Sequence, residues 1–254
     1  MKKIKQKIIY LISRAEIIYK ISKKITDYHN NNNNCDIRTN GEGYFIEKHK
    51  ETFDIVFDVG ANIGEWSQYM YNAKPNSKIY SFEPSKQTFT RLKENIKNPN
   101  NKIYNLGLGK EKENKIFYNY GEESALNSQI ERKSIMKKSY EEDVKFDTLD
   151  NFCGENSIDN ISFLKIDVEG GELDVLKGSV GKISSGKIDY IQFEYGGTFI
   201  DARVFLKDIF DFFEDKPYTI YKITQNGLKK INKYDPSLDN FQYSNFIAKK
   251  NGNN

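Results

Sequence analysis

The chain has 254 residues, enough for one domain of ordinary size, and its 37% hydrophobic content with 17 Tyr and 17 Phe can fill a core. The formal net charge is only +3, with basic and acidic residues interleaved, which argues against a dedicated nucleic-acid-binding protein. Two cysteines, Cys35 and Cys153, form neither a zinc pattern nor a disulfide framework, and this favours the reducing cytoplasm. No apolar run approaches the roughly 20 residues that a transmembrane helix needs.

The N-terminal stretch MKKIKQKIIYLISRAEIIYKISKKI predicts an amphipathic helix. Ile4, Ile8, Ile18 and Ile21 recur at helical spacing, with lysines elsewhere. Charges interrupt the apolar positions and no small-residue cleavage site follows, so the stretch is not expected to be a signal peptide. The favoured expectation is that the helix packs on the domain or across a homodimer. The alternative is peripheral contact with a membrane surface.

An asparagine run at residues 30–34 follows this helix. It offers no hydrophobic side chain to bury, and we interpret it as a linker or loop. The sequence therefore predicts an N-terminal segment of residues 1–38, made of the helix and the asparagine-rich linker, and one domain of residues 39–254.

From about residue 40, short apolar runs alternate with amphipathic stretches. The predicted strands are 54–59, 78–83, 102–108, 161–168 and 187–195, and the predicted helices between them are 65–72, 87–98 and 172–177. Repeated strand–helix–strand units imply a parallel sheet with right-handed crossovers. The chain ends differently, with a predicted helix and then an antiparallel strand pair at the sheet edge: 202–214, 218–223 and 244–250. This order predicts an α/β fold with a Rossmann-like, mostly parallel sheet and an antiparallel edge strand, typical of class I methyltransferases.

Residues 109–146 are less regular and mostly polar. Only NKIFYN and YEEDVKF within them look like strands. We interpret this segment as a loop-bearing insertion between the third and fourth core strands, able to cover a pocket. The simpler alternative is that its charges are only solvated.

The stretch FDVGANIGEWS, residues 57–67, lies where the first predicted parallel strand passes into a helix. Gly60 lets the backbone approach a ligand closely, and Gly64 lets the helix pack against the strand. A dinucleotide-binding fingerprint needs glycine at the middle position, which is Asn62 here. Asp58, at the end of the strand, suits a ligand with a cationic amino group better than a pyrophosphate. Taken alone, this turn is weakly specific.

The next strand adds a second acidic residue, because YSFEP places Glu83 at its tip, 25 residues after Asp58. A carboxylate there can accept the protons of both ribose hydroxyls, and Pro84 stiffens the chain where adenine would lie. The alternative is that Asp58 and Glu83 only cap helices. Together with the turn, Glu83 predicts a site for an adenosyl group without phosphates, that of S-adenosylmethionine.

The motifs VFDVGANIGEWS, IYSFEPS, NLGLG and FLKIDVEGGELDVLKG together resemble the FkbM family of S-adenosylmethionine-dependent O-methyltransferases, as does TNGEGYFI just upstream. The resemblance covers residues 39–250, and KIDVEGGE is its most specific part. It implies a class I methyltransferase fold acting on a hydroxyl, with Asn40 and Glu42 closing over the cofactor. Gly107 stands where a small residue such as alanine is common. The expected cofactor-binding set is Asn40, Glu42, Asp58, Gly60, Ala61, Asn62, Gly64, Glu83, Pro84, Gly107 and Asp167.

Three acidic residues, Asp167, Glu169 and Glu194, lie at the carboxyl ends of the fourth and fifth predicted strands, where ligands bind in parallel sheets. Methyl transfer needs positioning and removal of the hydroxyl proton. Asp167 is the first choice for base or substrate anchor, and Glu194 is the second. Glu169 either orients these two residues or stabilises a helix N-terminus through its negative charge. Close carboxylates would raise one pKa and make a better base. Asp167 and Glu194 could instead hold a divalent cation, but with only two ligands evident no metal is expected.

The function these patterns favour is O-methylation of a sugar hydroxyl in capsular or other surface polysaccharide biosynthesis, with a sugar or a nucleotide-linked sugar as substrate. The aromatic Tyr195 and Phe199 in FEYGGTF could stack on a sugar ring or pack in the core. O-methylation of a polyketide or other secondary metabolite is the alternative. A nucleic-acid methyltransferase is disfavoured by the modest charge and by the absence of an NPPY-type motif. A non-catalytic adenosyl-binding module is disfavoured by the intact acidic cluster.

Overall fold

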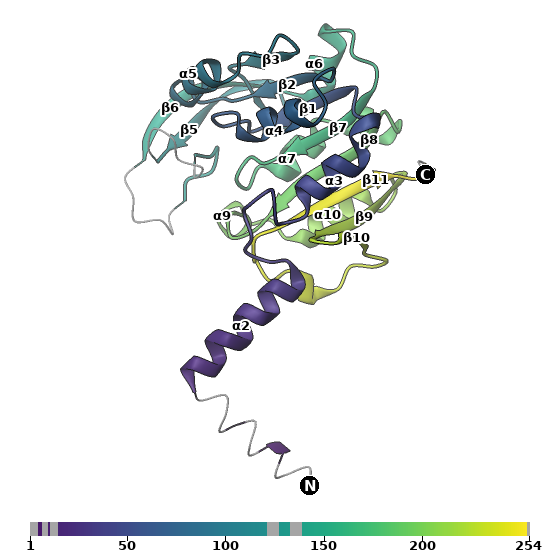
Figure 1. Ribbon diagram of the computed structural model, residues 1–254. Helices are drawn as coiled ribbons and strands as arrows, with labels where there is room; N and C mark the ends of the chain where they lie inside the picture. Colours follow the sequence, from purple (N-terminus) through teal and green to yellow (C-terminus); the bar gives the residue numbers. More distant parts are fainter. Residues whose placement is uncertain (1–4, 7–9, 11–14, 121–126, 133–138, 253–254) are drawn as a thin grey trace.

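The computed structural model describes residues 5–6, 10, 15–120, 127–132 and 139–252. It shows an α/β domain from which helix α2 projects (Figure 1). The helices are α2 Glu16–Asn30, α3 Glu42–His49, α4 Glu65–Ala73, α5 Lys86–Asn95, α6 Leu149–Glu155, α7 Glu172–Lys177, α8 Val180–Ser184, α9 Thr198–Ala202 and α10 Leu206–Phe213, with short 3₁₀ turns η1 Lys50–Thr52 and η2 Pro236–Leu238. The strands are β1 Ile55–Val59, β2 Lys78–Phe82, β3 Asn101–Tyr104, β4 Gly107–Leu108, β5 Glu113–Asn119, β6 Tyr140–Asp147, β7 Ile161–Ile166, β8 Ile188–Tyr195, β9 Tyr218–Thr224, β10 Gly227–Lys230 and β11 Ser244–Lys250.

The main sheet has the strand order β10-β9-β11-β8-β7-β1-β2-β3. Strands β3, β2, β1, β7 and β8 are neighbours in parallel, so their carboxyl ends share one edge of the sheet. Strand β11 pairs antiparallel with both β8 and β9, and β10 forms the outer edge as a hairpin with β9. The predicted α/β class and the antiparallel pairing of 218–223 with 244–250 are confirmed. Strand β11 lies within the sheet because β9 and β8 flank it, and β10 is the edge strand.

Helices cover both faces of this sheet. Side chains alternate between the two faces of a strand, and in β1 Val56 packs with Phe45 and Met70 beneath α3 and α4. Its neighbour Phe57 points the other way, into a larger cluster that includes residues of α6 to α10 such as Phe152. Burial on both faces explains why the central strands read as continuous apolar runs.

The insertion at 109–146 forms, together with the preceding strand β4, a second, three-stranded sheet with the order β4-β6-β5. The predicted strands NKIFYN and YEEDVKF are its antiparallel pair β5 and β6. The predicted strand 102–108 is divided into β3 and β4, because Asn105 turns the chain away from the main sheet. The Asn105 side-chain amide donates to the carbonyls of Glu83 and Pro84 at 3.0 and 2.8 Å. Residues 121–126 and 133–138 of the insertion lie outside the described residues.

The predicted helix 202–214 is the shorter helix α10, and a separate helix, α9, precedes it and shares only Ala202 with the predicted range. Arg203 adopts a left-handed conformation with φ of +56° and ends α9. Helix α10 begins three residues later, where the Asp239 carboxylate accepts the N–H groups of Leu206 and Lys207 at 2.6 and 3.3 Å. A carboxylate at a helix N-terminus satisfies amides that have no partner within the helix.

The asparagine run is a loop fixed to the domain. Asn31 and Asn33 take left-handed φ values of +52° and +57°, which asparagine tolerates better than most residues. The Asn31 side-chain amide donates to the carbonyls of Asn40 and Ile223, and the Asn33 N–H donates to the carbonyl of Tyr243. Side-chain polarity, rather than hydrophobic burial, fastens this loop.

Helix α2 has no buried residue and extends away from the domain (Figure 1). In its described part it does not pack on the domain's surface, which was one of the two arrangements favoured from the sequence. Among the helices the structure describes, none is long and apolar enough to cross a bilayer.

Candidate functional site

The turn after β1 passes directly against the end of β7. Gly60 has φ of +82°, and a Cβ added there would lie 1.8 Å from the carbonyl oxygen of Asp167, so only glycine fits. The N–H groups of Gly60 and Ala61 donate to the Phe82 carbonyl at 3.0 and 2.9 Å. The turn is thereby fastened to the two neighbouring strands that lead to Asp167 and Glu83.

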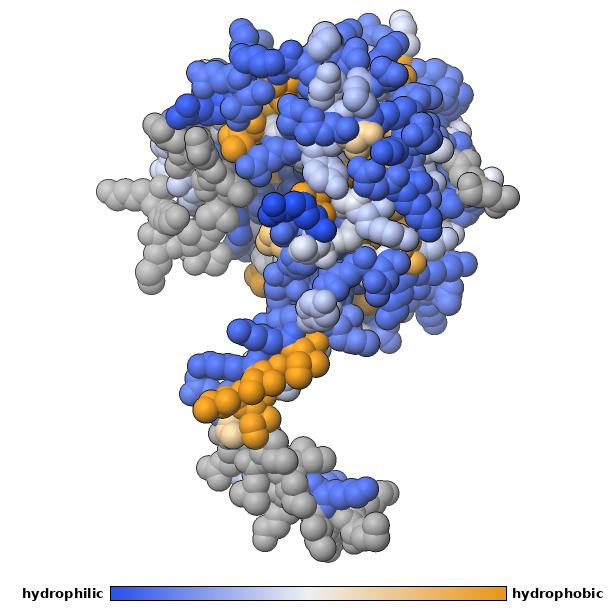
Figure 2. Space-filling view, in the orientation of Figure 1, coloured by the Kyte–Doolittle hydropathy of each residue, from blue (hydrophilic) through white to orange (hydrophobic). Residues whose placement is uncertain are grey.

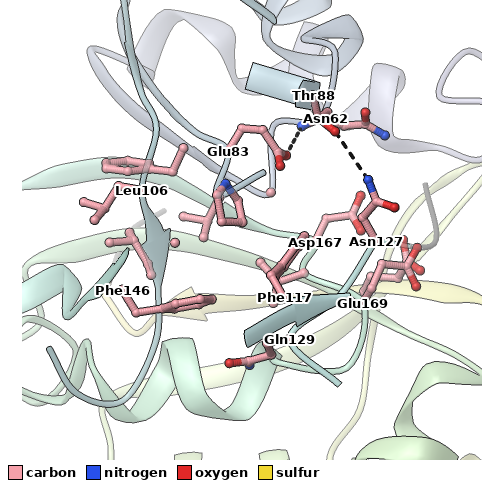
Figure 3. A pocket seen from close by; sticks show the side chains of 18 of the residues that line it. Asn62, Glu83, Thr88, Leu106, Phe117, Asn127, Gln129, Phe146, Asp167 and Glu169 are labelled. Carbon is pink, nitrogen blue, oxygen red and sulfur yellow. Dashed lines mark hydrogen bonds between the residues drawn. The ribbon is translucent and has the colours of Figure 1, made fainter. Parts of the chain in front are cut away.

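A cavity of about 390 Å³ opens at this edge of the sheet (Figure 3). In this view Glu83 lies beside Asn62, with Leu106 and Phe146 to one side and the pair Asp167 and Glu169 to the other. The lining residues are Cys35, Val59, Gly60, Asn62, Glu65, Phe82, Glu83, Pro84, Thr88, Leu106, Gly107, Leu108, Phe117, Asn127, Gln129, Phe146, Asp167, Val168, Glu169, Glu194 and Tyr243. Five of these described residues are acidic, and none is Lys, Arg or His.

Glu83 is held rigidly at the tip of β2. Its carboxylate accepts the N–H of Ser85 at 2.9 Å and the N–H of Asn62 at 3.1 Å. Burial raises the pKa of Glu83 to about 8, although these two N–H groups partly oppose the rise. Asn62 has a left-handed φ of +48°, and its buried Oδ1 has no hydrogen-bond partner in the described part of the chain. The turn therefore presents a carboxylate and an amide oxygen without donors between them, a poor cradle for phosphate and a good one for hydroxyl groups.

A buried lysine connects the turn to the acidic side of the cavity. Lys165 Nζ lies 3.3 Å from Asp58 Oδ1 and 3.2 Å from Asp167 Oδ2. Burial would lower the pKa of Lys165, but attraction by Asp167, Asp58 and Glu42 outweighs it and the pKa is raised. Asp58 is fully buried and also accepts the Ser67 hydroxyl at 2.7 Å. The Asp58 side chain thus faces Lys165, and it is not part of the cavity lining.

Asp167, Glu169 and Glu194 come together on the cavity wall, and one carboxylate oxygen from each lies within 4.8 Å of the others. Burial, followed by repulsion from Asp167 and Glu169, raises the pKa of Glu194 well above its ordinary value. Burial and Asp167 raise the pKa of Glu169 to about 8, against the attraction of Arg132, whose Nη1 lies 3.4 Å away. The sequence nominated only Asp167 and Glu194 as ligands for a cation, and Glu169 supplies the third oxygen that was missing.

Two predicted site residues sit behind the cavity wall. Asn40 and Glu42 are buried, and Glu42 accepts side-chain amide hydrogens from Asn40, Gln192 and Asn245 at 2.5, 2.5 and 2.9 Å. They are not among the lining residues. The hydrogen bonds of Glu42 to Gln192 and Asn245 connect α3 to β8 and β11.

Other residues singled out from the sequence fall on both sides of the wall. Pro84 and Gly107 line the cavity, and a Cβ on Gly107 would lie 2.5 Å from the Phe146 ring. A Cβ on Gly64 would meet Leu92 of α5 at 2.8 Å, so its close neighbour is that helix rather than a strand. Tyr195 and Phe199 pack in the core. Glu172, the last residue of KIDVEGGE, accepts the N–H groups of Val168 and Gly170.

A sequence model of the methyltransferase FkbM domain matches residues 58–220, more than half of the chain. The chain belongs to the FkbM methyltransferase family. The FkbM-matched region contains Glu83, Lys165 and the three clustered acids, whereas Asn40, Glu42 and α2 lie outside it. The resemblance found in the sequence motifs is confirmed.

Three curated methyltransferases are similar to part of the chain. Methyltransferase 1 of Beauveria bassiana is 30% identical over 143 residues, 49% of this chain and 57% of that protein. Hexuronic acid methyltransferase AglP of Haloferax volcanii is 29% identical over 148 residues, 58% of each chain. The 2-O-methyltransferase NoeI of Sinorhizobium fredii is 24% identical over 155 residues, 56% of this chain and 63% of that protein. The chain spans less than two thirds of the length of each.

Several residues of this FkbM site were not predicted from the sequence. Lys165 lies within FLKIDV, and a lysine in a buried central strand is itself a signal, because such a charge needs a partner. The parallel register places it opposite Asp58. Four lining residues come from the insertion, which was predicted only as a segment able to cover a pocket: Phe117, Asn127, Gln129 and Phe146.

The raised pKa of Glu194 predicts a pH-dependent stability. A carboxyl whose pKa is higher in the folded state contributes stability that is complete below its unfolded value of 4.5 and is lost as the pH rises through the folded value. Glu194→Gln stays neutral at every pH. We expect it to match the wild type near pH 5 and to exceed its free energy of unfolding by about 1–3 kcal/mol near pH 8, as measured by urea denaturation. Glu214→Gln, at an exposed position, is the matched control and should follow the wild type. A Glu194→Gln curve parallel to the wild type would contradict the assignment.

Proposed function

We propose that the chain is an S-adenosylmethionine-dependent O-methyltransferase that acts on a hydroxyl of a sugar. The observation that carries this proposal is the acidic lining of the cavity, where five carboxyl groups and no Lys, Arg or His side chain line the described wall. Such a wall offers no cation to pair with the pyrophosphate of a dinucleotide and favours a ligand with a sulfonium and an ammonium group. Membership of the FkbM family supports the same ligand.

The residues present fit this cofactor at three points. Glu83, with both oxygens anchored by backbone N–H groups, is placed to accept the ribose hydroxyls. Pro84 and the apolar Leu106 and Phe146 offer a flat, dry surface for adenine. The unpaired Oδ1 of Asn62 can accept one further proton from the ligand. When bound, the cofactor would supply an electrophilic methyl group on a sulfonium.

In the acidic cluster we assign substrate anchoring and proton removal to two different carboxyl groups, Asp167 and Glu194. Asp167 has its charge paired with Lys165, and we assign it to anchoring the substrate. Glu194, whose pKa is raised by burial and by its acidic neighbours, is the base that removes the hydroxyl proton, since a base works best when its pKa approaches the operating pH. Glu169, held by Arg132, orients the pair. This ordering reverses the first and second choices made from the sequence.

A metal-free reaction is retained in this proposal. The three carboxylates offer the oxygen ligands that a hard cation prefers. Two of them already have cationic partners, however, with Lys165 at 3.2 Å from Asp167 and Arg132 at 3.4 Å from Glu169. These side chains supply the positive charge that a metal would otherwise bring.

The proposal of a sugar substrate is supported by a relative rather than by the geometry of the cavity. The hexuronic acid methyltransferase among the relatives supports a carbohydrate acceptor. Capsular or other surface polysaccharide is the class of product that we favour. The acidic wall implies that the diphosphate of a nucleotide-linked sugar would have to stay outside the cavity while the hydroxyl enters.

Calorimetry tests the cofactor assignment. We expect S-adenosylhomocysteine, the demethylated product, to bind more tightly than NAD or ATP, and Glu83→Gln to weaken this binding by about 1.5–3 kcal/mol through loss of charge-assisted hydrogen bonds. Because the ionised Glu83 pairs with the hydroxyls, wild-type affinity should rise with pH up to about 8 and then level off. Glu94→Gln, on the exposed side of α5, should bind as the wild type does. Tighter binding of NAD would refute the assignment.

Mass spectrometry tests the reaction. The protein is incubated with S-adenosylmethionine and a panel of free, nucleotide-linked and lipid-linked sugars, and the expected result is a sugar that gains one methyl group. Glu194→Gln should bind S-adenosylhomocysteine normally and lose about two to four orders of magnitude in turnover, the usual worth of a positioned base. Activity should survive exhaustive chelation.

Three results would redirect this proposal. Turnover abolished by a chelator and restored by magnesium or manganese would assign the three carboxylates to a cation. Transfer to a polyketide-type hydroxyl but to no sugar would select the secondary-metabolite alternative. Tight cofactor binding without transfer to any acceptor would leave an adenosyl-binding module.

A further inference from the structure

Helix α2 carries a continuous apolar stripe that nothing in the described structure covers. Figure 2 shows it as a row of hydrophobic residues along the projecting helix. Ile17, Ile21, Ile25 and Tyr28 are 73%, 55%, 64% and 73% exposed. Large aliphatic side chains on a helix are normally buried against a neighbour, so the stripe calls for a partner.

The stripe occupies one side of the helix only. At 100° per residue, Ile18, Ile21, Ile25 and Tyr28 follow one another at spacings of three and four, and Ile17 lies beside them. The opposite side carries the ion pairs Lys20–Glu16 at 2.7 Å and Lys23–Asp27 at 3.0 Å. Lys24 flanks the stripe. This is the division expected of a helix lying at the boundary between an apolar phase and water.

The N-terminal segment that contains α2 differs in net charge from the rest of the chain. Residues 1–30 contain eight Lys and Arg and two acidic residues, a net charge of +6, whereas the whole chain carries +3. Residues 31–254 therefore carry a net charge of −3. Five of the eight basic residues precede α2 in the sequence and three, Lys20, Lys23 and Lys24, lie on it, so the positive charge and the apolar stripe belong to the same N-terminal segment.

We propose that α2 is an interfacial anchor that binds an anionic lipid surface, with its isoleucines among the acyl chains and its lysines at the headgroups. Both features of the N-terminal segment are then satisfied at once: the apolar side chains of α2 leave water, and the excess positive charge of residues 1–30 meets lipid phosphates. The helix lies on the surface, because no described helix is long and apolar enough to cross a bilayer.

A second copy of this chain is the competing partner for the stripe. Pairing two such helices would also cover the isoleucines, but it would bring two segments of net charge +6 together. Like charges at close range oppose association, whereas an anionic surface is complementary to them. The domain's own surface is a poorer partner still, because the bonds of Asn31 and Asn33 direct the helix away from it.

The test is flotation of the full chain with vesicles, and it does not depend on the enzymatic proposal. Vesicles of phosphatidylcholine are compared with vesicles that contain equal parts of phosphatidylcholine and phosphatidylglycerol. We expect binding to the anionic vesicles, little binding to the neutral ones, and weakening by added salt. The variant Ile21→Asp with Ile25→Asp should lose about tenfold or more of this binding.

A matched variant separates the apolar face from charge alone. Ser22→Asp with Thr26→Asp adds the same two negative charges on the same helix, off the stripe, and should lose distinctly less binding. Failure of the wild type to bind anionic vesicles, or equal losses in the two variants, would overturn the proposal. Light scattering gives the competing outcome: a dimer that Ile21→Asp with Ile25→Asp dissociates, without vesicle binding, would assign the stripe to a second copy.

Discussion

The site depends on one buried ammonium group. Lys165, on the central strand β7, lies between Asp58 of β1 and Asp167 at the end of its own strand, at 3.3 and 3.2 Å. An isolated charge at the depth of Lys165 or of Asp58 would be costly, but the two buried groups and the half-buried Asp167 compensate one another. This pairing holds β1 and β7 in register beneath the turn that contains Gly60. The turn, and the residues it presents to the cavity, therefore rest on Lys165.

The same pairing shapes the chemistry proposed above. Because Lys165 compensates Asp58 and Asp167 from behind, the cavity wall itself can remain acidic without any cationic side chain among its described residues. Three further carboxyl groups of the wall, Glu83, Glu169 and Glu194, have raised pKa values, chiefly through burial. Of these, Glu83 is placed for hydroxyl recognition and Glu194 for proton removal. A single lysine thus separates an anchoring carboxylate from a basic one.

Much of this arrangement was readable from the sequence because it depends on local patterns. Alternating apolar runs and amphipathic stretches gave the parallel strands, and strand ends located Glu83, Asp167 and Glu194. The direction of the Asp58 side chain was not readable, since it depends on the register that places Lys165 opposite. The end of α9 at Arg203 and the start of α10 at Leu206 could not be predicted for a similar reason. The left-handed backbone of Arg203 and the hydrogen bond from Leu206 N–H to the Asp239 carboxylate depend on tertiary contacts. Glu169 was grouped with Asp167 and Glu194 from the sequence, but its left-handed φ of +55°, and the approach of its carboxylate to the other two as a third oxygen ligand, were not predicted.

The most direct test of the account is the free energy of unfolding of Lys165→Met, alone and combined with Asp58→Asn. Asp58 is fully buried. Removing its cation should therefore lower the free energy of unfolding by about 3–5 kcal/mol, because an uncompensated charge is left inside. Neutralising Asp58 in the same chain should restore a large part of that loss. A Lys165→Met protein as stable as the wild type, or a double variant no more stable than Lys165→Met, would contradict the central role of this lysine.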